Sequence, residues 1–274
     1  SDEPIARGND EALDRLKGIA DHFLTHNRRI HMRCDDSVVR VSMGHETLLR
    51  RSRGWVPEPI KLPFLFRREI LATGAELKNT FCFAKGNYAF LSQHIGDLEN
   101  LETLTFFENS IEHFKKVFDL KPEVIAYDLH PEYLSTKYAL HLASDIRHRG
   151  SGADLVGVQH HSAHIASCLA DNGLTEPVIG VAFDGSGYGL DGNIWGGEFL
   201  TGDLRGFERA AHLKYVPLPG GGAAIKEPWR MAFSYLYSTF GERALDLSPL
   251  RRFERGRLET LKKMVELGLN SPLP

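Results

Sequence analysis

Apolar residues recur along the chain in patterns typical of both helices and strands. Residues 101–118 carry apolar side chains every three or four positions, which predicts an amphipathic helix. Short apolar runs at 124–127 and 155–158 predict buried strands. Further helices are predicted at residues 11–24, 134–149, 162–171, 229–240 and 254–267, and further strands at 30–33, 38–42, 70–73, 79–85, 88–94, 179–183 and 194–201. A hairpin followed by alternating helices and strands predicts an α/β protein whose mixed sheet is covered by helices.

A proline-rich stretch divides this pattern. Residues 55–63 hold three prolines in nine positions, and proline removes a backbone donor and favours extended neighbours. We therefore expect a linker at 58–62 between a first part, 1–57, and a second part, 63–274. The first part has too few apolar positions to form a core of its own, so it is expected to be the end of a domain. With no initiator Met and no closing element, the sequence is expected to be cut from a longer chain.

Composition limits the kinds of partner. The 274 residues carry a net charge of −3, so there is no overall basic surface for DNA. No apolar run approaches the roughly 18 residues of a membrane helix, so no membrane partner is expected. The three cysteines have no paired spacing and no signal peptide is visible, which indicates a reducing, cytoplasmic location.

A histidine pair is the first candidate site. His160 and His164 are four residues apart, so a helix there places both imidazoles on one face. Two neutral imidazoles so placed can share a Zn or Fe ion, although such a site needs at least one more protein ligand. The alternative is that one ring packs while the other is solvated. His161 lies about 100° around the helix from the pair and is expected to be a bystander or a supporting group.

A glycine-rich turn is the second candidate. Residues 184–192 hold four glycines in nine positions between two predicted strands. Glycine allows close approach to a ligand and positive φ, so successive N–H groups can face an anion. A plain long hairpin is the alternative. Asp184 ends the apolar run, where such folds place catalytic or metal-linked carboxylates.

A third glycine run lies further along the chain. Gly220, Gly221 and Gly222 precede Lys226, whose ammonium could steady a phosphate. A flexible loop with a solvated lysine explains the same residues.

Several sequence strings together resemble the HypF family of hydrogenase-maturation carbamoyltransferases. They are QHHSAHIA (159–166), FDGSGYGLDGNIWGGEFL (183–200) and KEPWRMA (226–232), with RCDDSVVRV (33–41) and RRSRGWVP (50–57) upstream. The resemblance implies that 1–57 is the C-terminal part of a YrdC-like domain. It implies that 63–274 is the first part of a transferase domain of the actin/sugar-kinase/Hsp70 superfamily.

The resemblance also implies an activity. Members of this family use carbamoyl phosphate and ATP with Mg²⁺, pass through carbamoyl-adenylate, and carbamoylate the C-terminal cysteine of HypE. That product becomes the cyanide ligand of [NiFe] hydrogenase. Two alternatives stay open: an O-carbamoyltransferase acting on a small-molecule hydroxyl, and a non-catalytic lobe that binds nucleotide or protein.

Site roles follow from the same resemblance. His160 and His164 would hold Fe or Zn, and a third ligand, an aspartate, would lie beyond Pro274. Asp184 would open the nucleotide turn as the catalytic acidic residue. The remaining ligand-binding positions would be Gly185, Gly187, Gly189, Gly220, Gly221, Gly222 and Lys226. The isolated chain is expected to be incompetent for turnover.

Overall fold

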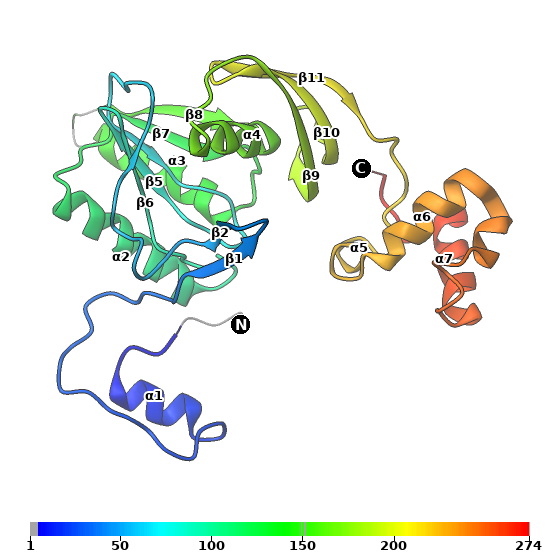
Figure 1. The fold of residues 1–274 in the computed structure, drawn as a ribbon, viewed down its shortest axis with the longest axis horizontal. Helices are drawn as coiled ribbons and strands as arrows, with labels where there is room; N and C mark the ends of the chain where they lie inside the picture. The colour runs from blue at the N-terminus through cyan, green and yellow to red at the C-terminus, as the bar shows by residue number, and fades with distance from the viewer. Residues whose placement is uncertain (1–4, 149, 151, 274) are drawn as a thin grey trace. The chain divides into compact units, whose positions relative to one another are not determined.

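The computed structural model describes residues 5–148, 150 and 152–273. Arg149, the last residue of one predicted helix, lies outside this described part. The chain forms two compact units, Ser1–Val158 and Gln159–Pro274, which are described separately (Figure 1). The predicted linker at 58–62 stays a prediction, and Ile60–Lys61 within it form a short strand, β3.

A six-stranded mixed sheet is the centre of the first unit. Its strand order is β3-β6-β5-β4-β7-β8, with β4, β7 and β8 parallel and the other neighbours antiparallel. Beyond β3, the bounds are β4 (Ile70–Ala72), β5 (Cys82–Lys85), β6 (Tyr88–Leu91), β7 (Val124–Asp128) and β8 (Asp154–Val158). The predicted α/β class with a mixed sheet is therefore confirmed.

Helices α2 (Leu101–Val117) and α3 (Leu134–His148) cover one face of this sheet. The side chain of Asn100 caps α2 by accepting from the Thr103 amide at 2.8 Å. The apolar stripe of α2 packs on β4 and β5, and the Phe107 ring meets Tyr138 of α3 edge to face. Each fully buried aromatic ring here contributes roughly 2–3 kcal/mol.

The segment before the sheet is less regular than predicted. It contains α1 (Asn9–Leu16) and the hairpin of β1 (Val38–Ser42) and β2 (His45–Arg50). The helix predicted to residue 24 is wrong beyond Leu16, because Ile19 and Leu24 are exposed and find no surface to pack on. The strand predicted at 30–33 is also wrong. Arg33 instead donates to carboxylates of Glu11 and Glu102.

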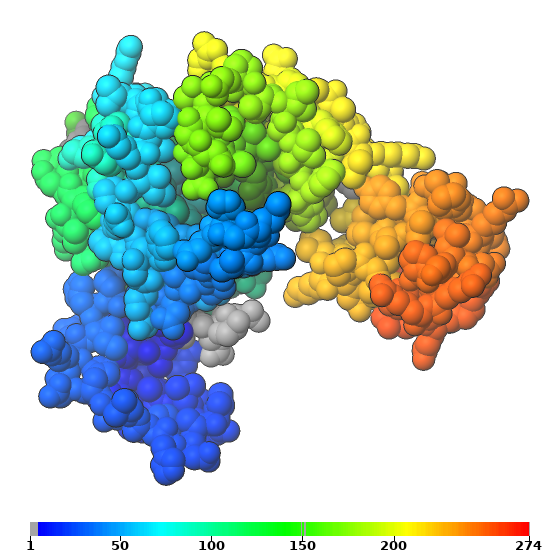
Figure 2. Space-filling view, viewed as in Figure 1, coloured from blue at the N-terminus to red at the C-terminus, as the bar shows by residue number. Residues whose placement is uncertain are grey.

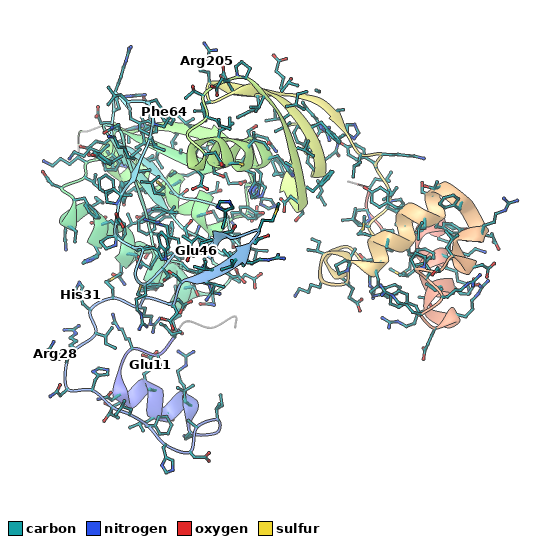
Figure 3. All side chains as sticks on the ribbon, in the orientation of Figure 1. Glu11, Arg28, His31, Glu46, Phe64 and Arg205 are labelled. Carbon is teal, nitrogen blue, oxygen red and sulfur yellow. The ribbon has the colours of Figure 1, made fainter. Side chains whose placement is uncertain are left out.

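The second unit begins with a helix and an antiparallel sheet. Helix α4 (His160–Asp171) packs on β9 (Val178–Tyr188), which pairs with β10 (Ile194–Asp203), and β10 pairs with β11 (Gly206–His212). A Cβ at Gly180 would come within 2.7 Å of Ile165, so glycine at this position allows the helix to approach the strand closely. Arg205 lies at the β10–β11 turn (Figure 3).

A helical cluster completes this unit. It comprises α5 (Gly222–Lys226), α6 (Trp229–Phe240), the 3₁₀ helix η1 (Gly241–Asp246) and α7 (Arg255–Leu267), orange to red in Figure 2. Phe233, Leu250 and Leu258 are buried between α6 and α7. As predicted, α7 ends at Leu267, and the next residue, Gly268, adopts the left-handed conformation with φ 65°. None of the helices in the described part of the chain has the length and apolar character that a bilayer crossing requires.

The glycine-rich turn is shorter than the sequence predicted. Strand β9 continues through Asp184 to Tyr188, and β10 supplies ladder partners as far as Ile194 opposite Tyr188. Glycines weaken a strand but do not forbid one when a neighbour satisfies its backbone. Strand β11 and helix α5 were not predicted.

Candidate functional site

The histidine pair is positioned by the start of α4. The side-chain oxygen of Gln159 accepts from the Ser162 amide at 2.9 Å and caps the helix, so the helix begins at His160 rather than at 162. Both rings therefore sit on one face, and their Nε2 atoms are 3.2 Å apart.

Asp184 of β9 completes a three-residue group with this pair. Its Oδ2 lies 3.0 Å from Nε2 of His160 and 4.0 Å from Nε2 of His164. The three potential ligand atoms all lie within 4.8 Å of one another. Ligand atoms about 2.0–2.1 Å from a tetrahedral zinc ion are roughly 3.3 Å apart, close to the spacing found here. Two imidazoles and one carboxylate fit Zn or Fe(II) and leave positions open for another ligand.

The surroundings of Asp184 favour its ionised form, which is the form that binds a cation. Burial alone would raise the pKa of Asp184, but the His160 hydrogen bond and charge and the Gly185 amide hold it below its usual value. The carboxylate is therefore ionised at neutral pH. From the sequence, Asp184 was expected in the nucleotide turn. In the structure it also lies beside His160 and His164. The proposed aspartate beyond Pro274 stays a prediction.

Two of the predicted phosphate-facing glycines make room for rings. A Cβ at Gly187 would lie 2.5 Å from Cε1 of His161 and 2.8 Å from Cδ2 of His160. A Cβ at Gly189 would lie 2.2 Å from Nε1 of Trp195. The absence of side chains at these positions is thus explained by packing around the histidines and Trp195.

Backbone amides that were expected to face an anion already have partners within the protein. Four of the predicted amides already donate to protein oxygens: Gly185 to Asp184 Oδ1, Gly189 to Asn193 O, Gly220 to Asn270 O and Gly221 to Leu218 O. Gly222 and Lys226 begin and end the short helix α5. A nucleotide-binding role for these residues stays a prediction, since an anion would have to compete with these internal bonds.

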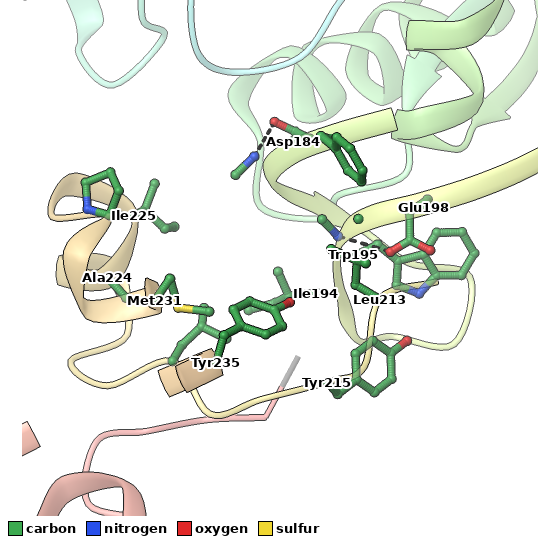
Figure 4. Close-up of a pocket in the computed structure, with 16 residues that line it drawn as sticks. Asp184, Ile194, Trp195, Glu198, Leu213, Tyr215, Ala224, Ile225, Met231 and Tyr235 are labelled. Carbon is green, nitrogen blue, oxygen red and sulfur yellow. Dashed lines mark hydrogen bonds between the residues drawn. The ribbon is translucent and has the colours of Figure 1, made fainter. Parts of the chain in front are cut away.

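A pocket of about 340 Å³ opens beside Asp184. Strands β9 and β10 form one wall, with Asp184, Gly185 and Trp195, and helices α5 and α6 form the other, with Ile225 and Tyr235 (Figure 4). Its volume lies within the range of small-molecule sites. The lining is mostly apolar with a few polar side chains, as is typical of small-molecule sites.

Glu198, which lines the same pocket, belongs to an ion pair that was missed from the sequence. Glu198 of β10 is 1% exposed, and its Oε2 accepts from Nε of Arg209 at 2.6 Å. The Arg209 guanidinium lies 3.9 Å from the centre of the Trp195 ring and also donates to the Tyr215 hydroxyl. Burial alone would lower the pKa of Arg209, but the bonds to Glu198 and Tyr215 raise it. The pairing was not predictable because β11, which carries Arg209, was not predicted.

Comparisons with known proteins give a consistent result. Residues 66–171 match the family described as "HypF Kae1-like domain", and 180–274 match "Carbamoyltransferase, Kae1-like Domain, second subdomain". The chain is 47% identical over 239 residues to "Carbamoyltransferase HypF2" of Cupriavidus necator, covering 86% of this chain and 29% of that protein. It is 42% identical over 272 residues to "Probable carbamoyltransferase HypF" of Methanocaldococcus jannaschii, covering 98% and 35%.

Solved structures agree. Full-length HypF in a phosphate- and nucleotide-bound form superimposes with a TM-score of 0.84 at 45% identity, covering all of this chain and 41% of that one. HypF of T. kodakarensis gives 0.82 at 39% identity, covering 98% and 36%. The chain thus spans less than half the length of these relatives.

Proposed function

Because the chain belongs to the HypF family, we propose that it forms part of an ATP-dependent carbamoyltransferase of hydrogenase maturation. The observation that carries the proposal is the convergence of His160, His164 and Asp184, of which Asp184 also lines the pocket of about 340 Å³. The substrates would be carbamoyl phosphate and ATP with Mg²⁺, and the acceptor would be the C-terminal cysteine of HypE.

The three donors would hold Fe or Zn. Such an ion would neutralise phosphate charge and polarise the carbamoyl group. Asp184 and the two imidazoles would fix its place, and Gly187 leaves the space that the rings of His160 and His161 occupy. The apolar wall of Ile225 and Tyr235 would receive the adenine of carbamoyl-adenylate and exclude water from it. The residues here therefore work mainly by orienting the adenylate.

The transfer itself needs no nucleophile from this chain. The HypE thiolate sulfur forms a bond to the carbamoyl carbon, the bond from that carbon to the phosphate oxygen breaks, and AMP leaves with the electron pair. The three cysteines of this chain are free thiols. We propose a cytoplasmic location, where reducing conditions keep the HypE cysteine reactive.

The first test is metal content. In the intact protein that contains this chain, His164→Ala should lose bound Fe or Zn by elemental analysis. His141→Ala should keep it, because that exposed histidine lies on α3 of the other unit. Unchanged metal in His164→Ala would contradict the proposed site.

The second test separates the proposed activity from its two alternatives. Carbamoyl phosphate, ATP and Mg²⁺ are supplied with either HypE or a sugar acceptor, and carbamoylation is followed by mass spectrometry. Modification of the HypE C-terminal cysteine supports the proposal, and modification of the sugar hydroxyl instead supports an O-carbamoyltransferase. No product and no calorimetric heat with ATP would support a non-catalytic lobe.

A further inference from the structure

His161 is the one histidine of the α4 group whose role is not yet explained. Its side chain is fully buried, at 0% exposure, between the metal-site candidates and the Trp195 ring. Its Nε2 has no hydrogen-bond partner and lies 3.8 Å from Oδ2 of Asp184. A buried polar atom without a partner is destabilising and rare in native proteins, so its retention here calls for an explanation.

Gln159 determines which nitrogen of His161 carries the proton. The Gln159 side-chain oxygen accepts from the Ser162 amide, which fixes the orientation of its carboxamide. Its NH₂ group therefore donates, at 3.1 Å to Nδ1 of His161 and at 3.1 Å to the Tyr188 carbonyl. Nδ1 must accept, so the proton of the neutral ring is on Nε2.

The Nε2–H group therefore faces an ionised carboxylate. Closing the 3.8 Å separation from Asp184 Oδ2 to a hydrogen bond needs a movement of about 1 Å. In the structure, the same oxygen is engaged at 3.0 Å by His160 Nε2. When His160 gives its Nε2 lone pair to a cation, His161 becomes the donor available to that carboxylate. Carboxylates that bind metals are commonly held in this way by a neighbouring donor.

We propose that His161 is a positioning residue whose Nε2–H orients the Asp184 carboxylate toward His160 and His164, and that Gln159 selects the tautomer that permits it. The inference rests on the metal site of the proposed function.

Three substitutions distinguish hydrogen-bond donation by His161 Nε2–H from simple filling of space by its ring. His161→Phe fills the space without a nitrogen, whereas His161→Gln places an amide N–H near the position of Nε2. Gln159→Glu keeps an oxygen to cap Ser162, but its carboxylate accepts from Nδ1–H and so moves the ring proton away from Nε2.

The readout is the affinity of the intact protein for Co²⁺, followed by its absorption bands, together with the unfolding midpoint. His161→Phe and Gln159→Glu should weaken Co²⁺ binding about 10- to 100-fold, the usual effect of losing a supporting group. His161→Gln should restore binding to within about threefold of wild type. Phe and Glu variants that fold and bind Co²⁺ as tightly as wild type would overturn the inference.

Imidazole ¹⁵N shifts of the metal-free protein, labelled at histidine, test the tautomer directly. A proton on Nε2 of His161 whose resonance moves in Asp184→Asn supports the inference, and a proton on Nδ1 refutes it. This measurement stands even if His161→Phe fails to fold. A wild-type protein that binds no Co²⁺ would instead refute the metal site, and the tautomer result would still decide the role of His161.

Discussion

Replacing Gly187 by alanine tests the packing on which the site depends. The new Cβ would lie 2.5 Å from Cε1 of His161 and 2.8 Å from Cδ2 of His160, closer than carbon atoms can approach. One of the rings must therefore move. Because His161 is fully buried and His160 is 14% exposed, we expect His160 to take up most of the displacement.

The magnitude follows from the cost of overpacking. An inserted methyl group in a packed interior costs about 1–3 kcal/mol. Without metal, the His160 ring can turn away and relieve part of this strain. With metal, the ring must return, so the strain appears as lost affinity. Since 1.4 kcal/mol is a factor of ten, the dissociation constant for Co²⁺ or Zn²⁺ should rise by about 5- to 150-fold.

Gly185→Ala is the matched control on the same strand. Its Cβ would meet nothing closer than Ile225 Cγ2 at 3.8 Å, an ordinary contact. Competition titration with a chromophoric chelator should give this variant wild-type metal affinity. If Gly187→Ala binds metal as tightly as Gly185→Ala and unfolds at the same urea concentration, the close packing described here is refuted.

Two further predictions concern stability. Arg209→Met leaves the buried Glu198 carboxylate unpaired and should cost about 3–5 kcal/mol in urea unfolding, whereas Arg205→Met, at a 90% exposed side chain, should leave the midpoint unchanged. Equal urea midpoints for the two variants would contradict the loss of stability expected for Arg209→Met. Burial and then the charge of Arg50 lower the pKa of His94 below its unfolded value of about 6.5. The folded state therefore binds this proton less readily, so stability should fall as pH drops below about 6.5. His94→Gln should make the free energy of unfolding fall less between pH 7.5 and 5.5 than it does in the wild type. Equal falls in the two proteins would contradict the contribution assigned to His94.

The long periodic elements were predictable from the sequence because their own residues specify them. The apolar stripe of 101–118 gave α2 to within one residue of its observed end. The predicted helix at 11–24 failed because its later apolar positions lack a surface to cover, which no local pattern reveals. Strand β11 was missed because its stability comes from the ladder with β10.

The candidate site was predictable in its residues more than in its geometry. The spacing of His160 and His164 foretold two convergent imidazoles. The glycines suggested an anion cradle, yet 187 and 189 lie where rings fill the space of a side chain. That contact depends on how α4 packs across β9, a long-range arrangement. The pair of Glu198 and Arg209 likewise joins two strands and has no signature within either one.

Because Trp195 lines the pocket, ligand binding there can be followed by tryptophan fluorescence. Its indole is 4% exposed, its ring centre is 6.2 Å from that of His161, and it lines the pocket. Its emission should consequently respond when a paramagnetic ion or a stacked purine arrives. The chain holds only three tryptophans, so a Trp195→Phe difference spectrum isolates that response and gives arrival rates by stopped flow without any attached dye.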